Sequence, residues 1–130
     1  MSLTRFLKYF LLSLVVISAA HAMVSADTPF FQATANKSTV GLNEQFQVTF
    51  TVNGSARNFM QPNMSDFVVL SGPNQSSSIQ FVNGAMSQSL SLSYILQPKA
   101  EGSFKIGPAS IEVEGKRIAS NVVNITVVKG

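Results

Sequence analysis

The sequence predicts an all-β fold, and three observations lead to that prediction. Apolar and polar residues alternate strictly over much of the chain after residue 30, for example at residues 46–52. Turn-forming pairs such as Asn83-Gly84 separate the alternating runs, and no stretch after residue 22 has sustained helical periodicity. A period of two is that of a half-buried strand, and several short strands separated by turns are typical of two packed sheets. We therefore expect an immunoglobulin-like β-sandwich of about eight or nine short antiparallel strands.

Turn signals set the limits of the expected strands. Residues 40–44 contain a glycine and an asparagine ahead of the strand at 46–53, and Asn53-Gly54 ends it. Asn83-Gly84 is the strongest short hairpin signal, because both residues tolerate a positive φ. Residues 71–77 lie between two expected strands. The expected strands lie near residues 30–35, 46–53, 67–70, 78–83, 86–97, 103–107, 109–114, 117–119 and 122–128.

The same alternation predicts which side chains are buried. Phe50, Leu92, Phe104 and Ile125 each belong to an inward-facing set of a strand. The chain contains no cysteine, but residues 23–130 are enough to bury a core without disulfides.

The first 22 residues have the pattern of a secretory signal peptide. Arg5 and Lys8 precede an apolar run at residues 9–20, and small residues occupy Ala20 and Ala22. The apolar run is shorter than the about 20 residues that a membrane-spanning helix needs. We expect export, cleavage after Ala22 and a mature domain at residues 23–130.

The charge of the mature part gives no indication of nucleic-acid binding. Loss of Arg5 and Lys8 lowers the formal net charge from +3 to +1. The adjacent basic pair Lys116-Arg117 is expected in a hairpin turn rather than on a basic face with interleaved aromatic residues. We expect no nucleic-acid partner.

The mature part has few residues suited to catalysis. The single histidine, His21, belongs to the predicted signal peptide, and the chain has neither cysteine nor tryptophan. A Ser-His-Asp arrangement and the common nitrogen or sulfur ligands of transition metals are therefore missing. We expect a protein that is not an enzyme, with no catalytic residues, no metal site and no cofactor.

Two segments are candidates for binding another protein. Residues 58–67 are rich in Phe and Met, and Pro62 excludes a central strand there. Phe59, Met60 and Met64 either form an adaptable partner-binding surface or fill the open end of the sandwich. Alternate serines at residues 87–93 line one face of a strand, which either accepts a partner's strand or is an ordinary solvated face.

Two motifs in combination resemble a known family. Ser71-Gly72-Pro73 precedes the serine run at residues 76–78, and Pro98-Lys99 is followed by Gly, Phe and Ile-Gly at residues 102–107. Through these residues the chain resembles the N-terminal domain of BatD, the bacterial oxygen-tolerance (aerotolerance) family, over nearly its whole mature length. The matching segments are residues 31–33, 40–46, 67–78, 82–84, 94–109, 111–116 and 120–121.

The resemblance implies a place in the bacterial cell envelope, in the periplasm or on the outer face of the inner membrane. It implies a non-enzymatic protein-interaction domain linked to oxygen or stress tolerance, with other envelope proteins as partners, among them von Willebrand A-domain proteins. Family members are long and carry a transmembrane helix near the C-terminus, whereas we expect no membrane span in residues 23–130. A stand-alone periplasmic binding or adhesin-like module is the alternative.

Overall fold

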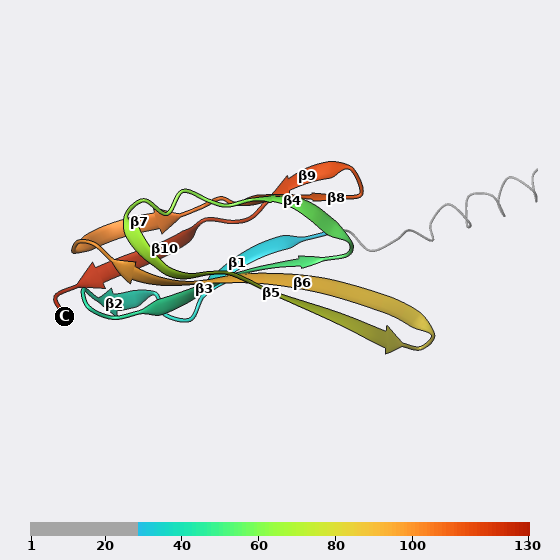
Figure 1. The fold of residues 1–130 in the computed structure, drawn as a ribbon, viewed down its shortest axis with the longest axis horizontal. Coiled ribbons are helices and arrows are strands. Elements are labelled where there is room, and N and C mark those ends of the chain that lie inside the picture. The colour runs from blue at the N-terminus through green and yellow to red at the C-terminus, as the bar shows by residue number, and fades with distance from the viewer. Residues whose placement is uncertain (1–28) are drawn as a thin grey trace, which may run out of the picture.

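A computed structural model describes residues 29–130, which form ten β-strands (Figure 1). This described part contains no helix, so the prediction of an all-β fold is confirmed. Accordingly, no helix within residues 29–130 is long and apolar enough to cross a membrane. The predicted signal peptide at residues 1–22 lies outside the described residues. The strands in chain order are β1 (Phe31–Ala35), β2 (Thr39–Gly41), β3 (Phe46–Asn53), β4 (Ala56–Met60), β5 (Phe67–Val82), β6 (Ala85–Pro98), β7 (Gly102–Ile106), β8 (Ser110–Val113), β9 (Lys116–Ala119) and β10 (Val123–Val128).

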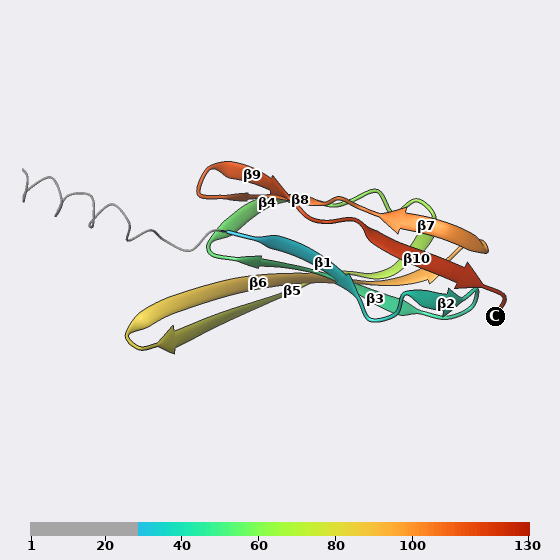
Figure 2. The same ribbon diagram turned by 180° about the vertical axis from the view of Figure 1, so that it is seen from behind.

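The strands form three sheets that together make a sandwich. One layer is a four-stranded antiparallel sheet in the order β1-β3-β6-β5. The other layer has the sheet β2-β10-β7 at one end of the molecule and the sheet β4-β8-β9 at the other (Figures 1 and 2). All strand pairs are antiparallel except β2 with β10, which run parallel. The architecture is that of the expected immunoglobulin-like sandwich.

The core lies between the two layers and is built from the alternating residues of the strands. In β3 every second side chain, from Phe46 to Val52, is buried. Phe50, Leu92 and Ile125 are buried as predicted. Phe104 lies at the rim instead: it is partly buried and packs edge-on against Phe67, with ring centroids 5.9 Å apart.

Two short strands were not predicted from the sequence. β2 has three residues, too few to show an alternating pattern, and it forms through its pairing with β10. β4 is mostly exposed, and a bulge between Arg57 and Met60 interrupts its pairing with β8. Asn58 in that bulge has a φ of 55°, which disturbs the period of two on which the prediction depended.

The predicted interruption at residues 71–77 is wrong, because β5 runs through it as a single strand from Phe67 to Val82. The register shifts twice between Val69 and Asn74, and Gly72 there has a φ of 125°. A Cβ on Gly72 would lie 2.7 Å from the Cδ1 atom of Tyr94, so only glycine fits this close approach. The predicted Asn83-Gly84 turn is confirmed: both residues have a positive φ, 53° and 78°, and they join β5 to β6.

Candidate partner-binding site

Of the three residues predicted to bind a partner, Phe59 packs inside the molecule. It lies on β4, which pairs with β8 and faces the four-stranded sheet. Its ring contacts those of Phe31, Phe50 and Tyr94, with centroids 6.3, 5.9 and 6.5 Å away. Phe59 therefore belongs to an aromatic cluster that joins the two layers.

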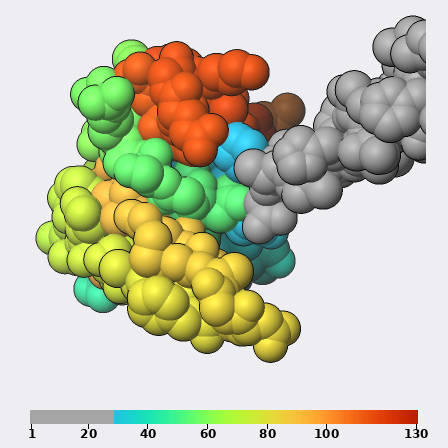
Figure 3. Space-filling view, turned by 90° about the vertical axis from the view of Figure 1, so that its right-hand side faces the viewer, coloured from blue at the N-terminus to red at the C-terminus, as the bar shows by residue number. Residues whose placement is uncertain are grey.

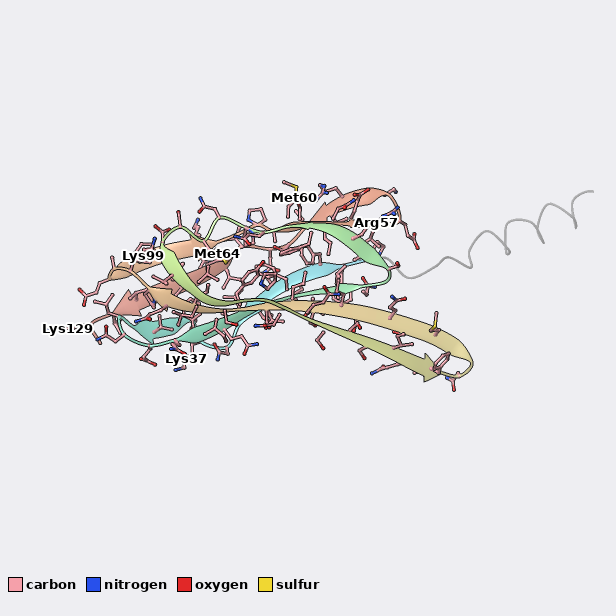
Figure 4. The ribbon with its side chains drawn as sticks, in the orientation of Figure 1. Lys37, Arg57, Met60, Met64, Lys99 and Lys129 are labelled. Atoms are coloured by element: carbon pink, nitrogen blue, oxygen red, sulfur yellow. The ribbon has the colours of Figure 1, made fainter. Side chains whose placement is uncertain are left out.

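Met60 and Met64 have opposite surroundings. Met64 is 6% exposed and belongs to the core, whereas Met60 is 59% exposed and points away from the sandwich (Figure 4). Pro62 between them is buried. Each interpretation of this segment holds for part of it. Met64 is buried in the core and the partly buried Phe59 packs against it, whereas Met60 presents its side chain to solvent. A role in partner binding stays a prediction, and it now depends on Met60.

A second candidate surface is the end of the β5–β6 hairpin, which extends past the rest of the sandwich (Figures 1 and 2). The neighbouring strand β3 ends at Asn53, opposite Ser89 of β6. Just beyond that pair the Gly54 N–H donates to the backbone oxygen of Gln88 over 2.7 Å, and β5 and β6 then continue with each other from Gln80 opposite Ser87 to Val82 opposite Ala85. We call residues 79–88 the arm. Every side chain of the arm is exposed.

Three large apolar side chains of the arm share one face. Phe81 lies opposite Met86, and both share a face with Ile79 because residues two apart along a strand point the same way. Their exposed fractions are 76%, 62% and 59%. This face continues that of Leu90 and Leu92, which enter the core, but in the arm no opposite sheet covers it.

The end of the sandwich beneath the arm is open. In Figure 3 the orange-red β8–β9 hairpin and the yellow arm lie at opposite sides of this end, with the green part of the chain between them. A pocket of about 200 Å³ lies among Met86 and Gln88 of the arm, Gly54 in the turn after β3, and Val113 of β8. The apolar face of the arm thus borders a hollow instead of a packed layer.

The hairpin also lacks charge. Between Phe67 and Pro98 the sequence contains no Asp, Glu, Lys, Arg or His, although this stretch includes the exposed arm. The serine face that the sequence suggested lies on the same hairpin. Ser87 is exposed, while Ser91 is half-buried and its Oγ atom lies 3.4 Å from Oγ1 of Thr51 on β3. The absence of charge combined with Ile79, Phe81 and Met86 is the signal that would have pointed to the arm from the sequence.

Among residues 29–130, the ion pairs between charged side chains lie on the surface of the sandwich. Lys37 Nζ donates to Glu44 Oε2 over 2.8 Å, and the Gly41 N–H donates to Glu44 Oε1 over 2.9 Å. These two hydrogen bonds, first that from Lys37, lower the pKa of the Glu44 carboxyl. Burial raises the pKa of the Tyr94 phenol, whose hydroxyl donates to Gln61 Oε1 at 3.4 Å. In the part of the chain that the structure describes, no three acidic side chains cluster as metal ligands would.

Comparison with known proteins identifies one similarity. The family model described as "BatD DUF11 like domain" matches residues 33–127, which covers the last three residues of β1, all of β2 to β9, and β10 except Val128. No curated protein and no solved structure matches the chain.

Proposed function

Because the chain belongs to the BatD family, a family of envelope proteins, we propose that it is a non-enzymatic domain that binds another envelope protein through the arm. The observation that carries this proposal is the uncovered apolar face of Ile79, Phe81 and Met86. Contiguous apolar side chains on a soluble domain are typical of sites where another molecule binds. An aromatic residue and a methionine are also among the residues enriched at protein interfaces.

The surroundings of the arm support protein contact over small-molecule binding. Small-molecule sites are enclosed cavities of about 300–1,000 Å³, and the pocket beneath the arm is smaller and open. A projecting hairpin presents a narrow ridge, which fits a groove or an edge of another protein. This favours an interaction domain over the alternative of a stand-alone module that binds glycans.

The proposal includes the setting that the family resemblance implies. The domain is exported to the periplasm or to the outer face of the inner membrane, and its partners are envelope proteins with von Willebrand A domains. The contact serves oxygen or stress tolerance. Met60 is proposed as a second contact, since its side chain is exposed on β4.

Site-specific photo-cross-linking in cells tests the proposal. A photoreactive phenylalanine analogue replaces Phe81, and in a matched control it replaces Val128, which is 44% exposed on β10 at the other end of the sandwich. We expect an adduct with a von Willebrand A-domain protein from position 81 and none from position 128. Equal adducts from both positions, or none from position 81, would contradict binding through the arm. The same analogue at Met60 tests the second contact.

A further inference from the structure

We propose that the partner binds the arm by strand addition: an uncharged, extended segment of the partner pairs with the outer edge of β5 at residues 74–82. This inference rests on the proposed function and specifies how the contact is made. Among the strands that the structure describes, β5 is at the edge of the four-stranded sheet, with β6 on one side and no strand on the other. An edge strand leaves a row of backbone donors and acceptors that an extended peptide can pair with.

The register fixes which backbone groups face the unpaired side. A two-residue turn makes Val82 and Ala85 a hydrogen-bonded pair, and such pairs alternate along an antiparallel ladder. The pairing from Val82 back to Asn74 is uninterrupted, so the even-numbered residues of this stretch bond to β6. The N–H and C=O groups of Ser77, Ile79 and Phe81 therefore point away from β6, toward the unpaired side of the sheet. The side chains of these same three residues lie on the face of the sheet that continues into the core.

This part of the edge has none of the features that usually protect edge strands from pairing. Natural edges are blocked by charged side chains, prolines, bulges or a covering loop. In β5 both register shifts and Pro73 lie before Asn74, and residues 74–82 contain no proline and no charge. The first part of the strand is thus protected, and the part that ends in the apolar arm is open.

The chemistry of the arm indicates the kind of segment that fits. A strand added to β5 continues both faces of the hairpin, so its alternate side chains lie beside Ile79 and Phe81. Apolar residues at alternate positions would cover that face. A charged segment would lose solvation without meeting an opposite charge, because no charged residue occurs between Phe67 and Pro98.

A segment of another protein fits this edge better than a second copy of the chain does. A symmetric antiparallel pair of arms brings Ile79 opposite Phe81 only when it is centred on Gln80. Because β5 ends at Val82, that arrangement pairs residues 78–82 and leaves 74–77 uncovered. A symmetric pair centred on Ser78 covers residues 74–82, but it places Ile79 opposite Ser77 and Phe81 opposite Gln75, so neither apolar side chain meets another. A separate segment pairs along the whole edge.

A lipid surface suits the arm less well, although its tip is apolar. Inside a bilayer each unsatisfied backbone group costs several kcal/mol, so open strand edges do not occur there. The outward groups of Ser77, Ile79 and Phe81 would be unsatisfied in lipid, whereas an added strand satisfies them.

A backbone-directed substitution tests strand addition. Ser77→Pro removes an outward N–H and leaves the ladder to β6 intact, and Ser77→Ala is the matched control that keeps the N–H. The probe is a synthetic peptide of alternating valine and threonine as long as the edge, N-methylated on alternate residues so that it pairs along one side only. We expect its binding to the isotope-labelled chain, followed by NMR, to shift the amide protons of Ser77, Ile79 and Phe81 downfield. Ser77→Pro should weaken binding about tenfold or more, and Ser77→Ala should not.

The remaining outcomes separate this inference from the proposed function. If the peptide does not bind, or if Ser77→Pro binds it as well as Ser77→Ala does, strand addition is wrong. The arm still binds a partner by its side chains if Phe81→Ser abolishes the cross-link made from Met86 and Ser77→Pro keeps it. Dimers in sedimentation that Ser77→Pro dissociates would make a second copy the occupant and overturn the proposed partner. Co-sedimentation with neutral phosphatidylcholine vesicles that Phe81→Ser abolishes would overturn it in favour of lipid.

Discussion

The two halves of β6 have the same alternation of residues and opposite surroundings. In the C-terminal half Leu92, Tyr94 and Leu96 are 5%, 1% and 0% exposed. In the N-terminal half Met86 stands on the same face of the strand and is 62% exposed. The difference comes from the opposite layer, since β4 and its neighbours cover the first group and end before the second (Figure 1).

This comparison separates two properties that a strand pattern combines. Alternation determines which side chains share a face, but the opposite layer determines whether that face is buried. Where both are present the face contributes to stability. In the arm the face is present without its cover, and its apolar side chains are available for a partner. The following substitutions test that division.

The largest difference is expected between two phenylalanines. Phe50 is fully buried among Phe31, Phe59 and Tyr94, so Phe50→Ala should lower the free energy of unfolding by about 3–5 kcal/mol. Phe81→Ala in the arm should change it by less than about 0.5 kcal/mol, as is usual for surface positions. Urea unfolding followed by circular dichroism measures both. A comparable loss for Phe81→Ala would mean that the arm is part of the stabilising core.

Phe104 lies between these two extremes. It is partly buried at the rim and contacts Phe67 edge-on. We expect Phe104→Ala to cost about 2 kcal/mol, less than Phe50→Ala because less of the ring leaves water on folding. The same urea titrations apply, with Phe50→Ala as the reference. A cost below about 0.5 kcal/mol would remove Phe104 from the core, and a cost equal to that of Phe50→Ala would contradict its position at the rim.

These examples show how far the sequence leads. The alternation at residues 46–53 predicts β3 and its buried face, because a pattern with period two has one structural meaning there. In the β5–β6 hairpin the same alternation puts Phe81 and Met86 on the face of Leu90 and Leu92. Their exposure depends on where β4 and β8 end. The sequence leaves the role of Met64 equally undetermined, since a methionine two residues after a proline fits a core or a surface. Contacts between distant strands decide such cases, and no local pattern encodes them.

Two glycines of the hairpin provide the next test. Gly72 and Gly84 both have a positive φ, but a Cβ at Gly72 would also lie 2.8 Å from the backbone oxygen of Ser93, while Gly84 has open space around it. Gly84→Ala should cost about 1 kcal/mol from backbone strain alone. Gly72→Ala should cost about 2 kcal/mol or more, because β5 must also move away from β6. Thermal melts of the two variants compare them, and equal costs would mean that the close approach at Gly72 relaxes easily.

A small effect at neutral pH is expected from the Tyr94 hydroxyl, which belongs to the covered half of β6. Its ring packs edge-on against Phe50, and its hydroxyl makes a long hydrogen bond to Gln61. Tyr94→Phe keeps the ring, so it should change the free energy of unfolding by less than about 1 kcal/mol at pH 7. The effect should become visible in alkaline solution. Burial raises the pKa of the folded tyrosine above the unfolded value of about 10, so the unfolded chain loses this proton first.

Stability from the neutral phenol is therefore complete below about pH 10 and is lost as the pH rises through the folded pKa. Urea unfolding of wild type and Tyr94→Phe between about pH 7 and pH 11 measures this loss. All other side chains are the same in both proteins, so the difference between the two curves isolates Tyr94, and we expect the wild type to lose more stability than the variant does. If the stability of the two proteins changes with pH in parallel, water reaches the Tyr94 hydroxyl in the folded state. The covered part of the β6 face would then begin closer to the C-terminal end of the strand than the buried Tyr94 ring indicates.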